Sequence, residues 1–218
     1  MARRGAILDR DGTLIDFHRD AELGAVVSAF HPDQIRWLPG VLDGLRALAG
    51  AGFTLAIATN QPGAAKGQIP WGAIERTNAA LVTRLASEGI VVEEVAVCGH
   101  HPEGGPGGDA MLVRPCDCRK PAPGLLITLL RSLDLDVAQS WMIGDTDADV
   151  GAARRAGMRA GLVLDDRRCE LCPGRVGPEE GTLPSARSRV APPERVPDLT
   201  ATRFDRLAAA IVAAQKNR

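Results

Sequence analysis

Short apolar runs alternate along this chain with longer segments in which apolar residues recur every three or four positions. The runs predict strands at residues 5–9, 54–59, 92–98, 140–144 and 160–165. The periodic segments predict helices near residues 40–50, 72–88, 123–133, 147–156 and 203–214. Strands that alternate with helices are typical of βα units, so we expect an α/β fold built on a parallel sheet.

Length and composition fit this expectation. The chain has 218 residues, which suits a single domain spanning residues 1–218. Its 45% hydrophobic and 24% charged residues are ordinary for a globular protein. Residues 166–198 interrupt the alternation and are rich in Pro, Gly and Arg, which predicts an irregular surface excursion. The last helix would then close the domain.

Charge and aromatic content argue against some classes of partner. The net charge of −1 gives no basic field to attract nucleic acid or an anionic membrane, and 3% aromatic residues offer few platforms for base stacking. The apolar run near the start stops at Asp9, which is too short for a signal peptide, and no stretch could span a bilayer. We therefore expect a cytoplasmic, monomeric protein without a nucleic-acid or membrane partner.

The first candidate for chemistry is the pentapeptide Asp9-Arg10-Asp11-Gly12-Thr13, which follows the apolar run Ala6-Ile7-Leu8. Side chains alternate along a strand, so carboxylates two residues apart point to the same side. Two facing carboxylates repel each other unless a cation or a shared proton lies between them. The pattern predicts phosphate chemistry with a divalent metal; an acidic turn with a glycine is the plainer interpretation.

Other strand ends carry polar groups as well. Thr59-Asn60-Gln61 follows the second strand, Gly144-Asp145 with Asp149 follows the fourth, and Arg119-Lys120 comes directly before a helix. In an open parallel sheet such groups meet at the carboxyl ends of the strands. Taken singly, Thr59 could be a helix N-cap and Lys120 a solvated surface charge, but their order along the chain favours a shared site.

In this order the motifs resemble those of the haloacid-dehalogenase-like (HAD) phosphatase superfamily. The pentapeptide matches the first motif, Thr59 the second, Lys120 the third, and Gly144-Asp145 with Asp149 the fourth. The resemblance covers residues 5 to about 165. It implies a Rossmann-like parallel sheet with helices on both faces and Mg²⁺-dependent phosphoryl transfer through an aspartyl-phosphate. The spacing between the motifs leaves no room for a separate cap domain.

The resemblance also implies a role for each residue. Asp9 would be the nucleophile and Asp11 the general acid/base. Mg²⁺ would bind Asp9, the backbone carbonyl of Asp11, and Asp145, and Asp149 would orient its waters or the lysine. Thr59 and Lys120 would hold the charge on the transferred phosphoryl oxygens.

Four further residues form a candidate zinc site. Cys98-Gly99-His100 and Cys116-Asp117-Cys118 are two ligand pairs, and three thiolates with one imidazole make the closed tetrahedral set of structural zinc. Unrelated buried cysteines are the alternative, and His101 is a spare imidazole next to the favoured His100. A metal-anchored loop at about 98–118 would fix Arg119 and Lys120 over the phosphate site. A further pair, Cys169 and Cys172, is interpreted as free surface thiols rather than a second zinc site.

This pattern resembles the zinc-containing branch that holds heptose 1,7-bisphosphate phosphatases and histidinol-phosphate phosphatases. The long gap from His100 to Cys116 favours the heptose type, which implies a sugar-phosphate substrate, the 7-phosphate of D-glycero-D-manno-heptose 1,7-bisphosphate. Arg119 would then recognise the second phosphate or the sugar, and Asn60 and Gln61 would line the site. Thr146 and residues 14–29 depart from that pattern and leave the substrate open.

Three alternatives stay open at this point. The first is a histidinol-phosphate phosphatase with the same chemistry. The second is a zinc-stabilised binding protein without activity, which the intact set of motif residues disfavours. The third is a nucleic-acid 3′-phosphatase, which the near-neutral charge and the scarcity of aromatic residues disfavour. If the site is open as expected, the loop at 98–118 and the segment at 16–32 would form its walls.

Overall fold

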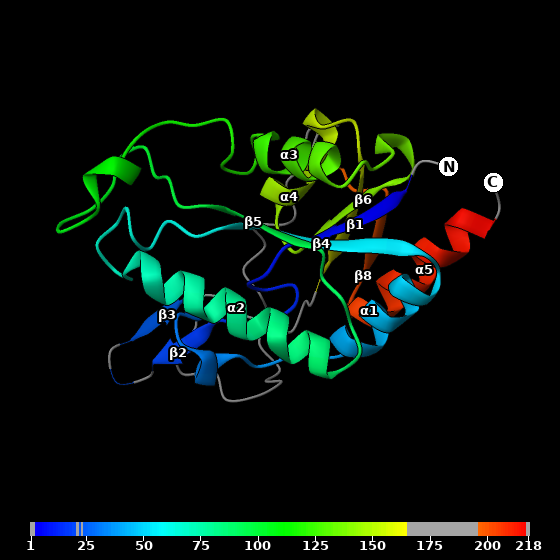
Figure 1. The fold of residues 1–218 in the computed structure, drawn as a ribbon, viewed down its shortest axis with the longest axis horizontal. Helices are drawn as coiled ribbons and strands as arrows, with labels where there is room; N and C mark the ends of the chain where they lie inside the picture. Colours follow the sequence, from blue (N-terminus) through cyan, green and yellow to red (C-terminus); the bar gives the residue numbers. More distant parts are fainter. Residues whose placement is uncertain (1–2, 21, 23, 165–195, 217–218) are drawn as a thin grey trace.

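A computed structural model describes residues 3–20, 22, 24–164 and 196–216. Its centre is a six-stranded sheet in the order β5-β4-β1-β6-β7-β8, and every neighbouring pair is parallel (Figure 1). The strands are β1 (Arg4–Leu8), β4 (Phe53–Asn60), β5 (Glu94–Cys98), β6 (Trp141–Gly144), β7 (Arg159–Val163) and β8 (Leu199–Ala201). The expected α/β fold with a parallel sheet is confirmed.

Five helices cover both faces of this sheet, as expected (Figure 1). One face carries α1 (Val41–Gly50), α2 (Trp71–Ser87) and α5 (Phe204–Lys216), and the other carries α3 (Gly124–Ser132) and α4 (Asp147–Arg155). The side chains of β1 divide between the two cores: Ala6 and Leu8 pack with α1 and α5, and Ile7 packs with α3 and α4. A strand buried on both faces reads as a continuous apolar run rather than an alternating one.

Several short elements were not predicted from the sequence. They are β8, the antiparallel hairpin of β2 (His18–Asp20) and β3 (Ala25–Val27), and the 3-10 helices η1 (Pro32–Gln34), η2 (Ala110–Leu112) and η3 (Val137–Gln139). Each has three residues, which is too few to show a period of either kind. The predicted excursion and the Cys169–Cys172 pair fall almost entirely outside the described residues, and the single domain stays a prediction.

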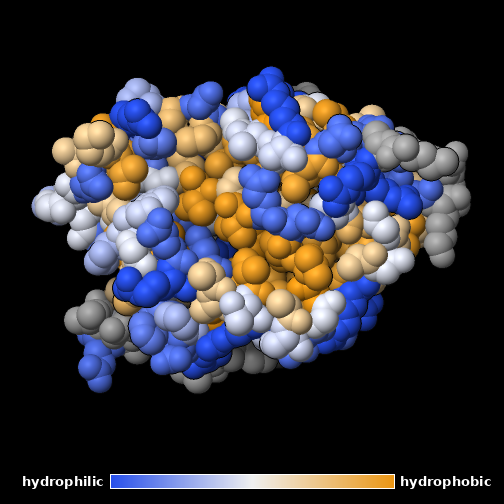
Figure 2. Space-filling view, viewed as in Figure 1, coloured by the Kyte–Doolittle hydropathy of each residue, from blue (hydrophilic) through white to orange (hydrophobic). Residues whose placement is uncertain are grey.

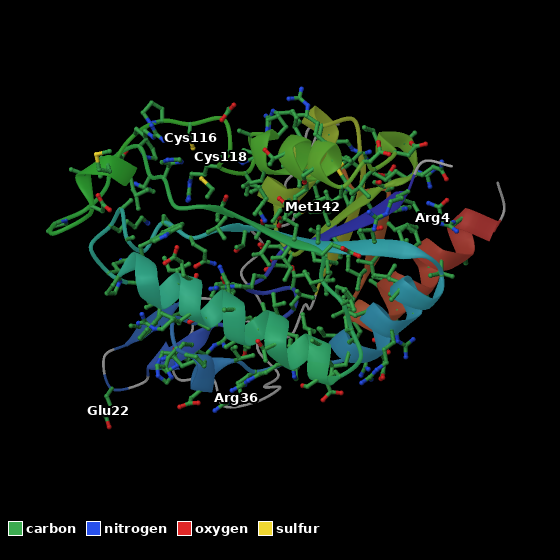
Figure 3. All side chains as sticks on the ribbon, viewed as in Figure 1. Arg4, Glu22, Arg36, Cys116, Cys118 and Met142 are labelled. Atoms are coloured by element: carbon green, nitrogen blue, oxygen red, sulfur yellow. The ribbon has the colours of Figure 1, made fainter. Side chains whose placement is uncertain are left out.

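Two irregular segments flank the carboxyl ends of the strands. The loop between β5 and α3 carries Cys116 and Cys118 on one side of the sheet, and the β2–β3 hairpin, with Glu22 between its strands, lies on the other side (Figure 3). Figure 2 shows hydrophobic residues gathered in the middle of the same view, between α2 and α3, where β5 forms the edge of the sheet. No cap domain is evident among the described residues. No helix in the described part of the chain is long and apolar enough to cross a membrane.

Candidate active site

Asp9 and Asp11 lie just beyond the carboxyl end of β1. The strand ends at Leu8, one residue earlier than predicted, but the Asp9 amide still donates to the carbonyl of Ile143 on β6 at 2.9 Å. The backbone then turns at Gly12, whose φ of 83° favours glycine. The turn, rather than strand alternation alone, therefore brings both carboxylates to one cleft.

This cleft has a volume of about 160 Å³. Its walls come from the residues at the ends of β1, β4 and β6, from the segments that flank the hairpin, from the loop before α3 and from the first turn of α4. They are formed by Asp9, Asp11, Phe17, Ser28, Thr59, Asn60, Lys120, Thr146, Ala148 and Asp149. The segment at 16–32 thus forms a wall, as predicted. No residue of 98–118 is among the described residues that line this cleft, so the predicted second wall is wrong here and Lys120 takes its place.

Lys120 is the cationic centre of the cleft. Its ammonium lies 2.8 Å from an oxygen of Asp9 and 2.6 Å from an oxygen of Asp149, and it donates to the Ala58 carbonyl at 2.8 Å. Burial alone would lower the pKa of Lys120, but the carboxylates of Asp149 and Asp9 outweigh it and raise the pKa above the usual value. Lys120 is therefore a fixed positive charge, not a solvated one.

Asp9 has a strongly perturbed proton affinity. Burial raises the pKa of its carboxyl from 3.8 to about 7; the Lys120 ammonium opposes this rise and the Asp149 and Asp11 carboxylates add to it. The side chain keeps 14% of its surface exposed, on the side of the cleft. A partly exposed carboxylate held beside an ammonium is suited to nucleophilic attack on a phosphate.

The segment after β6 contributes the other two carboxylates. Asp145 is buried and accepts a hydrogen bond from the Thr13 hydroxyl at 3.2 Å. Asp149, also buried, accepts from the amide and hydroxyl of Thr146 at 3.1 and 2.6 Å. Glycine is required at position 144, because a Cβ there would lie 2.2 Å from the Asp149 carboxyl carbon.

The acidic groups fit a hard cation. Carboxylate oxygens of Asp9, Asp145 and Asp149 all lie within 4.8 Å of one another, and oxygen ligands are those that Mg²⁺ prefers. The Asp11 carboxylate is turned toward Arg10 and Gln61, and the contribution of its backbone carbonyl to the metal stays a prediction. The outer role of Asp149 stays a prediction as well.

The two amides that were expected to contact substrate have partners inside the protein. The Asn60 side chain donates to the Lys120 carbonyl and accepts from the Lys120 amide, both at 3.0 Å. Gln61 is 1% exposed and donates to Asp11 at 2.6 Å and to Thr59 at 2.9 Å. Both therefore hold neighbouring site residues in place, and direct contact of either with substrate stays a prediction.

Sequence reasoning missed two residues of this region. Arg10, in the middle of the pentapeptide, is fully buried and pairs with the Asp11 carboxylate, and Asn78 on α2 accepts from Arg10. The sequence did show Arg10 between two aspartates, directly after an apolar run. Arginine is almost never fully buried unless it is paired, so this position was a candidate for an ion pair with a carboxylate. Asn78 had no such signal, since it lies 68 residues away in a helical segment.

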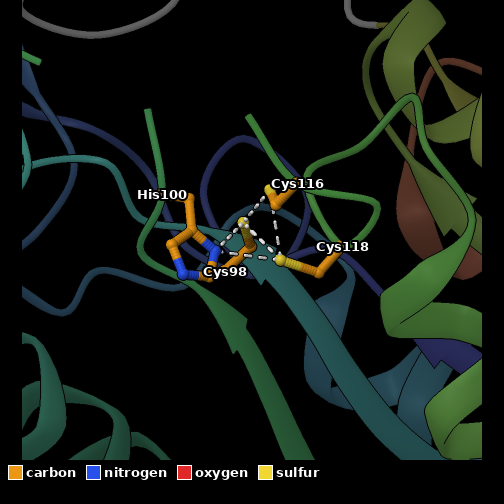
Figure 4. Close-up of side chains that lie close together, drawn as sticks. All are labelled: Cys98, His100, Cys116 and Cys118. Carbon is orange, nitrogen blue, oxygen red and sulfur yellow. Dashed lines mark hydrogen bonds between the residues drawn. The ribbon is translucent and has the colours of Figure 1, made fainter. Parts of the chain in front are cut away.

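The four predicted zinc ligands converge on one point (Figure 4). The Cys118 sulfur lies 3.0 Å from that of Cys98, 3.3 Å from that of Cys116 and 3.2 Å from the His100 Nδ1. Tetrahedral zinc with bonds of about 2.3 Å would hold its sulfurs about 3.8 Å apart. The Cys118 sulfur lies closer than that to the sulfurs of Cys98 and Cys116. The donor set and its compactness fit zinc.

Two details distinguish the histidines. His101 lies outside the cluster: its Nδ1 accepts from the Glu103 and Gly104 amides at 3.3 and 3.1 Å, while Nδ1 of His100 faces the sulfurs. The other ring nitrogen of His100 lies 2.9 Å from an Arg114 nitrogen. With a metal on Nδ1 that ring nitrogen carries the proton, so the Arg114 guanidinium, which can only donate, has to move aside.

The chain matches known proteins over most of its length. A family model described as HAD-hydrolase-like matches residues 117–171. The D-glycero-beta-D-manno-heptose-1,7-bisphosphate 7-phosphatase of Rhodopseudomonas palustris is 34% identical over 156 residues, which are 72% of this chain and 81% of that protein. The enzyme of the same name from Escherichia coli K12 is 34% identical over 146 residues, or 67% of this chain and 71% of that protein.

The fold also matches solved structures. The D,D-heptose 1,7-bisphosphate phosphatase of B. bronchiseptica, complexed with magnesium and phosphate, superposes with a TM-score of 0.67 at 27% identity and covers 97% of this chain and 99% of that one. The chain therefore belongs to the HAD-like hydrolases, in the family of the D-glycero-beta-D-manno-heptose-1,7-bisphosphate 7-phosphatases.

Proposed function

We propose that this protein is a Mg²⁺-dependent phosphatase that removes the 7-phosphate of D-glycero-D-manno-heptose 1,7-bisphosphate. The observation that carries the proposal is Asp9, a partly exposed carboxylate 2.8 Å from the fixed ammonium of Lys120 in a cleft with Asp145 and Asp149 close by. Relatives that bear this activity in their names share 34% of the aligned residues.

The first step is transfer of the phosphoryl group to the enzyme. A carboxylate oxygen of Asp9 forms a bond to phosphorus as the bond from phosphorus to the sugar oxygen breaks. Asp11 gives its proton to that oxygen, so the sugar leaves as an alcohol and an aspartyl-phosphate remains. Lys120 and Thr59, which line the cleft, hold the charge on the three phosphoryl oxygens during transfer.

The second step returns the enzyme to its starting state. Asp11, now a carboxylate, takes a proton from a water molecule, whose oxygen attacks phosphorus. The bond between phosphorus and Asp9 breaks, and inorganic phosphate leaves with the Asp9 carboxylate restored. Dividing the hydrolysis into two displacements lets one pair of carboxylates perform both halves.

Mg²⁺ would be held by the carboxylates of Asp9 and Asp145 and by the backbone carbonyl of Asp11, with Asp149 beside them. Bound there, it supplies positive charge that offsets the phosphate and the carboxylates that face it. With Asp11 ionised, the four carboxylates of Asp9, Asp11, Asp145 and Asp149 against the two cations Lys120 and Arg10 give the region a formal charge of −2; with Asp11 protonated for the first step the charge is −1, and a divalent ion offsets either.

Zinc at Cys98, His100, Cys116 and Cys118 would be structural. Three thiolates and one imidazole complete a tetrahedron and leave no position for substrate. The last ligand, Cys118, is two residues before Lys120, so the metal would fix the end of the loop from which the catalytic ammonium projects. Arg119 lies between them, half-buried, and would recognise the second phosphate or the sugar.

The test is a substrate panel. Phosphate release with Mg²⁺ is measured from the α and β anomers of heptose 1,7-bisphosphate, from histidinol phosphate and from 4-nitrophenyl phosphate. We expect the highest kcat/KM for one heptose anomer. Preference for histidinol phosphate would replace the substrate but keep the mechanism, and no turnover of any compound by magnesium-loaded protein would contradict the function.

A further inference from the structure

Arg10 has no role in the two steps above, yet it is fully buried in the centre of the first motif. Strand alternation would turn its side chain away from Asp9 and Asp11. Because β1 has already ended, the turn through Gly12 instead folds the guanidinium back along Asp11. Burying an arginine side chain is costly without compensating partners, so the contacts that it makes explain why it is there.

The guanidinium grips the Asp11 carboxylate with two parallel hydrogen bonds. Nε donates to Oδ2 and Nη2 donates to Oδ1, each at 3.1 Å. Such fork-to-fork pairs fix the plane of the carboxylate as well as its position. Gln61 donates to the same Oδ2 at 2.6 Å from the other side, so the orientation of Asp11 is set by two residues of the protein.

Arg10 is in turn fixed by two separate parts of the fold. Its Nη1 donates to the side-chain oxygen of Asn78 on α2 at 2.5 Å, and its Nη2 donates to the carbonyl of Ala29, which follows β3, at 2.9 Å. Asn78 is 7% exposed, so water does not compete effectively for this bond. Neither Arg10 nor Asn78 is among the described residues that line the cleft.

We propose that Arg10, held by Asn78, is the positioning residue for proton transfer by Asp11. The proposal rests on the proposed function, in which Asp11 is the general acid/base. Arg10 acts through Asp11 and touches no substrate: it fixes the plane in which the carboxyl group meets the leaving oxygen. Its charge also faces Asp11 when that carboxyl group is ionised, as it is before the second step.

This role makes a specific demand on the leaving group. When a sugar oxygen leaves, it would depart as a strongly basic alkoxide unless Asp11 delivers a proton as the bond to phosphorus breaks. A 4-nitrophenolate leaves without that proton. Loss of Arg10 or Asn78 therefore impairs transfer from a sugar phosphate and spares transfer from the aryl phosphate, whereas a general structural defect would impair both.

The experiment compares Asn78→Ala and Arg10→Lys with the wild-type protein. For each, kcat/KM is measured with magnesium on a sugar phosphate and on 4-nitrophenyl phosphate, since kcat/KM reports the steps up to formation of the phosphoenzyme. We expect a loss on the order of 10- to 100-fold on the sugar phosphate, a part of what general acid catalysis contributes, and a loss within about threefold on the aryl phosphate. Asp11→Asn serves as the reference for the same pattern.

Thr77→Val is the matched control, because Thr77 is buried beside Asn78 on α2 and its hydroxyl donates to the Ala73 carbonyl of its own helix. It should leave both kcat/KM values near wild type. Equal losses on the two substrates in Asn78→Ala and Arg10→Lys, or no loss on either, would overturn the positioning role. Failure of the proposed function gives a different result, since wild-type protein would then turn over neither substrate or Asp11→Asn would show no leaving-group dependence.

Discussion

The catalytic cleft and the cysteine–histidine cluster both gather functional side chains at one end of the sheet, but they are held together differently. In the cleft, opposite charges meet: Lys120 lies 2.8 Å from Asp9 and 2.6 Å from Asp149. In the cluster, the three thiols and the imidazole bring no opposite charges of their own. Burial, together with hydrogen bonds to the Cys98 and Cys116 thiols, raises the pKa of Cys118 above its usual value, so its thiolate is disfavoured without a metal.

The surrounding backbone differs in the same way. The cleft residues follow β1, β4 and β6, three adjacent strands in the middle of the sheet. The loop that carries Cys116 and Cys118 contains one 3-10 helix, η2, and one isolated bridge between His101 and Val113 among its described residues. We therefore expect the cleft to keep its shape without a metal, whereas the loop should need its ion to stay ordered.

The largest expected effect is the loss of phosphatase activity when Asp9 is replaced. Asp9→Asn removes the nucleophile but keeps a side chain of the same size beside Lys120, which still pairs with Asp149. We expect turnover of every phosphate substrate to fall roughly 10⁴-fold or more while the variant stays folded. Phosphate release and thermal unfolding check this together, and near-wild-type activity in the variant would be incompatible with an aspartyl-phosphate.

The next effect separates the loop from the sheet. In Cys118→Ser the cluster loses a thiolate, so we expect the zinc content to fall and kcat/KM to fall about 10- to 100-fold as Lys120 shifts from its position. Hydrogen exchange should speed up over residues 99–117 and stay slow in β1, β4 and β6. Full activity in a variant without zinc would show that the loop does not position the lysine.

A smaller effect concerns pH and magnesium. Burial raises the pKa of Asp9 to about 7, so protons compete with Mg²⁺ for that carboxylate below neutral pH. The ionised fraction at pH 8 exceeds that at pH 6 by about tenfold, which corresponds to about 1.4 kcal/mol of Mg²⁺-dependent stabilisation. Thermal unfolding with and without Mg²⁺ at both pH values measures it, and Asp9→Asn should show no such dependence.

Because folding raises the pKa of Asp9, the stability of the metal-free protein also depends on pH. A carboxyl whose pKa is raised by folding stabilises the folded state fully below about pH 4, and this contribution is lost as the pH rises through about 7. The wild-type protein without Mg²⁺ should therefore lose stability relative to Asp9→Asn across that window. A difference that grows in the opposite direction would mean that Lys120 outweighs burial at this site.

The smallest effect tests which histidine belongs to the cluster. His101→Asn removes a ring that accepts two loop amides and faces away from the sulfurs, so the free energy of unfolding should change by about 1 kcal/mol and the zinc content should not change. His100→Asn should lose the metal. Metal analysis of the two variants decides the assignment, and retention of zinc in both would reject His100 as a ligand.

Much of this arrangement could be predicted from the sequence because strand ends carry the chemistry. Thr59 and Asp145 each follow an apolar run of four or more residues, and a parallel sheet brings such ends to one edge. The zinc ligands were equally readable, since cysteine and histidine at fixed short spacings have few other uses in combination. Local spacing was sufficient in both cases.

What could not be predicted depends on contacts between distant segments. Asn78 points inward from the middle of α2, and its partner Arg10 is 68 residues away, so no spacing rule connects them. The β2–β3 hairpin and β8 have three residues each, and their stability comes from pairing rather than from their own apolar pattern. The segment at 16–32 was expected as a wall of the site, but not that it contains a hairpin.

The short distance along the chain between Cys118 and Lys120 has a thermodynamic consequence. One residue separates the proposed zinc ligand Cys118 from Lys120, whose ammonium pairs with Asp9, so an ion in the cluster and an ion in the cleft would bias the same stretch of backbone. Linkage then requires that each metal change the dissociation constant of the other by one common factor, about fivefold for 1 kcal/mol of coupling. A magnesium affinity describes this protein only when its zinc content is stated with it.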